Sequence, residues 1–181
     1  MQKSTIKFTY QDYVLLTEDD RRELIEGDFY VVPTPSIMHQ IVVMNLGVPL
    51  CKHVKGNRLG EVIWAPVDVV LAEDSVVQPD ILFVSNERRD IFTEANIQGA
   101  PDLVVEVLSP STADRDRQLK LSLYARFGVR EYWIVDPVAE LVEVMALGPG
   151  GTELTTTFTS GAATSGVVAG FEIGVGLVFA E

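Results

Sequence analysis

The sequence has one cysteine, two histidines and, over residues 137–181, no lysine or arginine. The single Cys51 excludes an internal disulfide bond and a zinc site built from cysteines, and it favours a small buried apolar residue. His39 and His53 do not have the spacing of a zinc-binding triad. No run of about 18 uninterrupted apolar residues is present, and the opening MQKSTIKFTYQDY lacks the layout of a secretory signal. We therefore expect a cytoplasmic protein that does not associate with a membrane.

Positive charge is also scarce, because 14 lysines and arginines stand against 26 acids and give a net charge of -12. This balance argues against broad, sequence-independent attraction to nucleic acid. The basic residues gather at KHVKGNR (52–58), at Arg88 and Arg89, and from Arg115 to Arg130. Any nucleic-acid face is expected there, and the alternative is that these residues only form solvated loops and helix faces.

Apolar residues make up 47% of the chain, which is enough for a substantial core and argues against general disorder. With 181 residues, we expect one domain that spans residues 1–181. The segment FTYQDYVLLTEDDRRELIEGD predicts short helical pieces, with Thr9 as a cap and an end at Gly27. A strand, DFYVVP, follows. Residues 37–55 predict the first long helix, capped by Ser36 and bent or frayed near Pro49.

The second half of the chain predicts a sheet with one crossing helix. Three strand-like runs, at 61–74, 79–85 and 102–108, suggest a meander. A helix is predicted from the capping pair Ser111 and Asp114 to about Phe127, where Gly128 supplies the stop, and a strand follows at 129–136. These short connections favour a right-handed parallel βαβ unit. The tail predicts antiparallel strands that flank the core.

One carboxylate, Glu106, lies within the apolar run 102–108. A buried carboxylate costs several kcal/mol unless a metal ion, a donor or a cation pairs with it. Asp80 follows Pro79 at the start of the neighbouring predicted strand, so we expect the two acids to meet on adjacent strands. Two converging carboxylates repel each other unless a divalent cation neutralises them. Ligands that are all oxygen suit Mg²⁺ or Mn²⁺.

The predicted helix 112–127 places a lysine on its inner side. At 100° per residue its apolar arc, which also contains Asp116 and Lys120, is marked by Leu119, Leu123, Tyr124 and Phe127. The residues predicted to face water are Arg115, Gln118, Ser122 and Arg126. We expect Lys120 to point towards the sheet and Glu106, and the alternative is a lysine that snorkels at the edge of the arc. Two acids, a metal ion and a lysine suit the attack of water on a phosphodiester.

Three stretches resemble the Uma-two family of endonucleases, within the restriction-endonuclease-like superfamily: RRELIEGDFYVVPTPSIMHQ, QPDILFVS and PDLVVEVLSPSTADRDRQLKLSLYARFGVREYWIVDP. The resemblance spans roughly residues 10 to 180. It implies an α/β (α+β) fold with a PD-(D/E)XK core of helix, three-strand meander, helix and strand, with extra flanking N- and C-terminal strands. Asp80 would be the motif aspartate and Glu106 the second metal-binding acid. The superfamily's usual lysine would fall at Leu108, so Lys120 would take its role.

The resemblance also implies further site residues. Glu23 would be a third metal or water ligand contributed by a first helix, or else an exposed helix acid, and Glu26 is the neighbouring candidate. His39 would contact phosphate or hold an acid, or else be a structural histidine. Asp68 would support a metal ligand or simply face solvent, and Tyr124 belongs to the matching block and is a candidate for substrate or supporting contacts.

Three functions are therefore compatible with the sequence. The first is a Mg²⁺-dependent, or Mn²⁺-dependent, endonuclease that hydrolyses DNA. The second is a module with the same fold and weak or no catalysis, which binds nucleic acid or a protein partner. The third is an oligomer-forming domain whose apolar C-terminal strands pair between copies, most simply as a symmetric homodimer.

Overall fold

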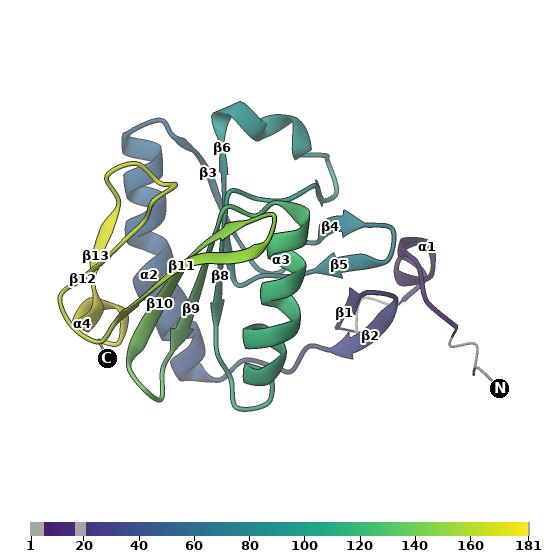
Figure 1. Cartoon of the computed structure of the whole chain (residues 1–181), viewed down its shortest axis with the longest axis horizontal. Helices are drawn as coiled ribbons and strands as arrows, with labels where there is room; N and C mark the ends of the chain where they lie inside the picture. Colours follow the sequence, from purple (N-terminus) through teal and green to yellow (C-terminus); the bar gives the residue numbers. More distant parts are fainter. Residues whose placement is uncertain (1–5, 17–20, 181) are drawn as a thin grey trace.

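The computed structural model describes residues 6–16 and 21–180, and most of its strands fall into two sheets (Figure 1). The order of the six-stranded sheet is β11 (Gly151–Phe158), β10 (Leu141–Gly148), β9 (Glu131–Asp136), β8 (Leu103–Val107), β6 (Ile81–Ser85) and β3 (Gly60–Trp64). The order of the five-stranded sheet is β2 (Asp28–Val31), β1 (Arg22–Ile25), β5 (Ser75–Val77), β4 (Val69–Ala72) and β7 (Ile97–Gln98). A separate pair is formed by β12 (Ala162–Thr164) and β13 (Glu172–Gly174).

Helices connect and cover these sheets. They are α1 (Tyr10–Tyr13), α2 (Ile37–Gly56), the 3₁₀-helix η1 (Asn86–Ile91), the π-helix η2 (Arg115–Lys120), α3 (Leu121–Phe127) and α4 (Val175–Val178). The fold is a mixed α+β fold, as predicted. Within the described residues, no helix combines the length and the apolar character that crossing a bilayer requires.

The predicted meander is confirmed, and its strands are β3, β6 and β8, each antiparallel to the next. The chain then crosses through η2 and α3 and returns as β9, which is parallel to β8. The single strand predicted over 61–74 is wrong, because this run divides into β3 and β4, which lie in different sheets. Pro66 lies between them, and proline has no backbone N–H to continue a ladder.

The two faces of the six-stranded sheet lie in separate cores, because strand side chains alternate. One face packs with α2 and the C-terminal elements and includes Val105 and Trp133. The other face packs with α3 and the five-stranded sheet and includes Val104 and Ile134. Figure 1 shows α2 and α3 on opposite sides of the sheet. Glu106 shares the face of Val104 and therefore points towards the chain segment of η2 and α3.

The N-terminal prediction is partly wrong. Thr9 does begin α1, and its backbone N–H donates to the Asp12 carboxylate at 2.8 Å. Residues 22–25, however, form strand β1 and not a helix, and they pair with β2, which was predicted as a strand. Glu26 and Gly27 have φ values of 52° and 79°, so Gly27 completes a tight hairpin turn and does not end a helix.

The long helix α2 is confirmed. The Ser36 side chain accepts from the His39 N–H at 3.1 Å and caps the helix, which continues through Pro49 to Gly56 without fraying there. Cys51 is a partly buried thiol on this helix and packs against the core.

The last helix before β9 ends as predicted, because Gly128 adopts a left-handed φ of 89° after α3. Its start differs, since Asp114 already has right-handed helical angles and the Ser111 hydroxyl lies 3.2 Å from that of Ser109. Residues 115–120 form a π-helix, which the sequence did not predict.

The tail forms the predicted antiparallel strands β10 and β11 beside β9. Near the end of the tail, the prediction of antiparallel strands holds over β13, and the chain then turns into the helix α4. The Asn45 side chain of α2 donates to the Val178 carbonyl of α4 at 3.2 Å and joins the tail to the long helix.

Candidate active site

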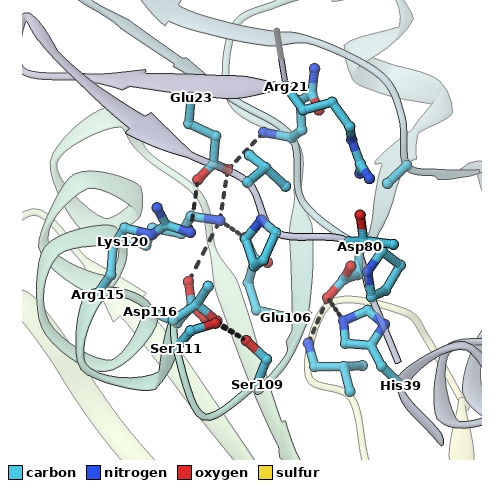
Figure 2. Close-up of a pocket in the computed structure, with 18 of the residues that line it drawn as sticks. Arg21, Glu23, His39, Asp80, Glu106, Ser109, Ser111, Arg115, Asp116 and Lys120 are labelled. Atoms are coloured by element: carbon cyan, nitrogen blue, oxygen red, sulfur yellow. Dashed lines mark hydrogen bonds and ion pairs between the residues drawn. The ribbon is translucent and has the colours of Figure 1, made fainter. Parts of the chain in front are cut away.

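A cavity of about 540 Å³ opens where several separate parts of the chain meet. Figure 2 shows its charged residues converging from strands, helices and a loop. They come from β1, α2, the residue before β6, the end of β8, and η2, and the ones that carry the argument are Glu23, His39, Asp80, Glu106, Arg115, Asp116 and Lys120.

Lys120 occupies the centre of this group. Its ammonium lies 2.7 Å from Glu23 Oε1, 2.8 Å from Glu106 Oε1 and 3.6 Å from Asp116 Oδ1. Only 3% of the Lys120 surface is exposed. The prediction that Lys120 points inward to Glu106 is confirmed, and the alternative of a snorkelling lysine is wrong.

The charge on Lys120 is stabilised by its neighbours. Burial alone lowers the pKa of an amine, but the charges of Glu106, Glu23 and Asp116 outweigh burial and raise the pKa of Lys120. The lysine therefore remains an ammonium at neutral pH. It is a fixed cation within the cavity.

Glu106 is the carboxylate for which the sequence predicted a charged or hydrogen-bonding partner. It is buried on β8 and accepts hydrogen bonds from Lys120 at 2.8 Å and from the Tyr124 hydroxyl at 2.7 Å. Burial raises the pKa of Glu106 well above its usual value, although the charge of Lys120 acts in the opposite direction. Burial also raises the pKa of Tyr124, so its hydroxyl keeps the proton that it donates.

Asp80 lies at the other side of the cavity. Its Oδ2 accepts from the Val107 backbone N–H at 2.8 Å and lies 3.1 Å from His39 Nε2. Burial lowers the pKa of His39, but the hydrogen bond and the charge of Asp80 outweigh burial and raise it. Of the roles considered for His39, holding an acid is therefore the one that the geometry matches.

Glu23 lies on strand β1 and not on a helix, so both the predicted first-helix placement and the alternative of an exposed helix acid are wrong. It is 1% exposed, and its Oε1 accepts from the backbone N–H of Gln78 at 3.0 Å. Its Oε2 lies 3.7 Å from the guanidinium of Arg115. The five-stranded sheet thus contributes one acid to a cavity whose other residues come from the six-stranded sheet, the helices and the connecting loops.

The two remaining candidates, Asp68 and Glu26, do not line the cavity, and within the described chain only Asp68 is connected to it by hydrogen bonds. Asp68 does not line it, but its Oδ1 accepts from Gln78 Nε2 at 2.8 Å and from Tyr13 at 2.7 Å. Because the backbone N–H of Gln78 also donates to Glu23, Asp68 is connected to the cavity through that glutamine. Glu26 is exposed, pairs with Arg126 at 2.7 Å and is not among the residues that line the cavity.

Two cavity residues were not assigned a role from the sequence. Arg115 was predicted to face water, yet its side chain is only 15% exposed and lies beside Glu23. The π-helix explains this difference, because its hydrogen bonds join residues five apart, which places Arg115 and Lys120 on the same side. The helical wheel placed Asp116 on the apolar arc, and this position was the only sequence feature that could have identified it as a cavity residue.

The acids suit a divalent metal ion, although they do not form a complete binding site. Within the described chain, no group of three or more histidine, cysteine, aspartate or glutamate side chains is arranged to hold a metal ion. The donor chemistry nevertheless fits a hard cation, because the charged donors are carboxylates. Moreover, Glu23 Oε2 and Asp116 Oδ1 are buried without a hydrogen-bond partner among the described residues. Asp80 and Glu106 line the same cavity but have separate partners.

Comparisons with known proteins agree with the fold. The chain matches the model of the Uma2 family, described as "Putative restriction endonuclease", over residues 9–176. It is 30% identical over 129 residues to the uncharacterized protein sll1609 of Synechocystis, and this match covers 68% of the chain and 71% of the relative. A crystal structure of a "putative nuclease belonging to DUF820" from Anabaena variabilis is similar with a TM-score of 0.80 and 20% identity, over 95% of this chain and 97% of that one. At this identity the similarity shows a shared, nuclease-like fold.

Proposed function

Because the chain belongs to the Uma2 family of restriction-endonuclease-like proteins, we propose that it is a Mg²⁺-dependent endonuclease that hydrolyses phosphodiester bonds of DNA. Mn²⁺ would serve as an alternative to Mg²⁺. The observation that carries the proposal is the buried ammonium of Lys120, held at 2.7 Å and 2.8 Å by Glu23 and Glu106 in the cavity that also contains Asp80.

The residues that would hold the metal ion are Asp80, Glu106 and Glu23. A divalent cation held by these residues would polarise a phosphoryl oxygen and would lower the pKa of a bound water. Each acid already has a partner that fixes it: His39 and the Val107 N–H for Asp80, Tyr124 for Glu106, and the Gln78 N–H for Glu23. Such supporting hydrogen bonds orient metal ligands.

Lys120 contributes a second positive charge. Its side chain is 4% exposed, and a fixed cation that is shielded from bulk solvent stabilises developing negative charge more strongly than one in water. We expect the ammonium to orient the attacking water or to offset the charge that accumulates on the phosphate. Both roles require only that Lys120 remains beside Glu106.

The direct test is plasmid nicking in Mg²⁺ or Mn²⁺ with wild type and Glu106→Gln. We expect the variant to lose at least about 100-fold in rate, because it removes a metal ligand and the partner of Lys120. Glu153→Gln is the matched control, since Glu153 is exposed on β11. Equal nicking by wild type and Glu106→Gln would show a contaminating nuclease and contradict the proposal.

A second function is the binding module with weak or no catalysis. It is favoured by one observation, namely that Lys120 already pairs with two of the three acids that a metal ion would need. Calorimetric titration with Mn²⁺ separates the two functions. Absence of binding at millimolar Mn²⁺, together with DNA or protein binding, would favour the module.

The homodimer stays a prediction. It is supported by β11, an edge strand of the six-stranded sheet on which Leu154 is 63% exposed, because an uncovered edge can pair with a second copy. Light scattering measures the mass in solution and would contradict this prediction if it gives that of one chain.

A further inference from the structure

We propose that Asp116 is a positioning residue, which keeps the Lys120 ammonium inside the cavity when a divalent cation engages Glu106 and Glu23. This inference rests on the proposed function and goes beyond it, because Asp116 is not one of the proposed metal ligands. It concerns the position of the Lys120 side chain when a metal ion binds Glu23 and Glu106.

The geometry distinguishes Asp116 from the two other acids. Glu23 and Glu106 approach the ammonium at 2.7 Å and 2.8 Å, which are hydrogen-bonding distances. Asp116 Oδ1 lies at 3.6 Å, which is an ion-pair distance but too long for a hydrogen bond. Among the described residues, Asp116 is therefore the third and most distant acidic partner of the lysine.

A hydrogen bond from Thr112 and the charges of Lys120 and Arg115 act on the Asp116 carboxyl group, but one of its oxygens lacks a hydrogen-bond partner among the described residues. Only 3% of the residue is exposed, and Oδ1 is buried without a hydrogen-bond partner among the described residues. A buried carboxylate oxygen in this state destabilises the fold. Buried polar groups that destabilise a fold in this way are commonly found at functional sites.

Metal binding would explain why a buried acid is needed at position 116. A cation on Glu106 and Glu23 competes with the ammonium for the same carboxylate groups, and Lys120 would otherwise be left as a buried charge without a partner. Asp116 then supplies the remaining negative charge. A small shift of the ammonium towards Asp116 Oδ1 keeps it in the cavity and satisfies that oxygen at the same time.

The helix backbone supports this arrangement. Asp116 and Lys120 are four residues apart in η2, so the acid and the lysine belong to one rigid turn. The Tyr132 hydroxyl, from β9, donates to the Asp116 carbonyl at 3.2 Å and attaches this turn to the sheet. Asp116 is thus held in place independently of the metal ligands.

The test compares Asp116→Asn with Asp114→Asn in the full chain. Asp114 lies on the same helical segment but is exposed, so its variant removes the same charge outside the cavity. For Asp116→Asn we expect kcat to fall about 10- to 100-fold, as for a misplaced catalytic group. KM for DNA and the calorimetric Kd for Mn²⁺ should stay within about twofold, and Asp116→Glu should recover part of kcat.

A second measurement does not depend on turnover. Acetylation of Lys120 by an amine reagent, followed by mass spectrometry in saturating Mn²⁺, should increase at least about fivefold in Asp116→Asn relative to wild type and Asp114→Asn, because an ammonium without its partner leaves the cavity.

The outcomes separate the two proposals. Absence of both Mn²⁺ binding and nicking in wild type would overturn the proposed function and this inference with it. Nicking by wild type with an unchanged kcat in Asp116→Asn would overturn this inference alone. A loss of Mn²⁺ affinity in Asp116→Asn would also overturn it, because Asp116 would then be a metal ligand, and a lowered melting temperature would make it a structural residue.

Discussion

At the scale of single residues, Lys120 is the side chain whose removal should have the largest effect. Lys120→Met keeps the length and apolar stem but leaves Glu23, Glu106 and Asp116 buried without their shared cation. Breaking a buried ion pair in this way costs about 3 to 5 kcal/mol, so we expect that loss in the free energy of unfolding. Urea denaturation measures it, and nicking should be lost as well.

Lys52→Met is the control, because Lys52 is exposed on α2. Addition of Mn²⁺ should raise the melting temperature of Lys120→Met more than that of wild type, since the metal ion replaces the missing positive charge. Wild-type stability of Lys120→Met without metal would contradict the ion-pair account of this site.

The sequence predicted the contact between Lys120 and Glu106 because both residues violate the apolar pattern around them, and each needs a partner. It also placed Asp80 correctly beside the same strand. It did not place Arg115, because the helical wheel assumes 100° per residue and residues 115–120 are π-helical. Nor did it identify the link between Asp68 and Glu23, since that link passes through the backbone N–H of Gln78, which has no sequence signature.

At the scale of elements, the approach of α2 to the sheet depends on a glycine. A Cβ atom at Gly47 would lie 2.2 Å from Nε1 of Trp64 on β3, which is far inside van der Waals contact. We expect Gly47→Ala to lower the free energy of unfolding by about 1 to 3 kcal/mol, the usual cost of overpacking. Thermal or denaturant unfolding measures the change.

Gly56→Ala is the matched control for this prediction. Gly56 ends the same helix, and a Cβ atom there meets nothing within 4 Å. We expect this variant to match wild type or to be slightly more stable, because alanine loses less backbone entropy on folding. Equal destabilisation by both substitutions would indicate that the helix, and not its contact with Trp64, is affected.

Element predictions succeeded where local signals were strong. The capping residue Ser36 and the apolar character of residues 37–55 gave α2, and Gly128 gave the end of α3. They failed where strands are short and pair over a distance, as in β1, which contains four residues and pairs with β5 about 50 residues later. The apolar residues of RRELIEG fit a helix and a strand equally over so few positions.

At the scale of the whole molecule, the basic cluster 52–58 and the cavity lie apart, whereas Arg115 and Lys120 of the basic segment 115–130 line the cavity. The cavity is at the beginning of α2, where His39 lies, and the cluster 52–58 is at its end. At about 1.5 Å per residue, His39 and Lys55 are roughly 24 Å apart along the helix. Lys55 and Arg89 moreover pair with Glu61, so their charges are partly neutralised. We therefore expect the DNA to be held by cations of the cavity and not by this cluster.

Arg21 is the residue that tests this view, because it is exposed and lines the cavity, where a phosphate would otherwise face mainly acids. We expect Arg21→Gln to weaken DNA binding in Ca²⁺ by about 1 kcal/mol and to reduce the slope of log K against log salt by about one, as for the loss of one phosphate contact. Fluorescence anisotropy over a salt series measures both quantities. Lys52→Gln should change neither, because Lys52 lies at the far end of α2. The opposite result, with a reduced slope for Lys52→Gln alone, would place the DNA on the basic cluster and separate the binding surface from the cavity.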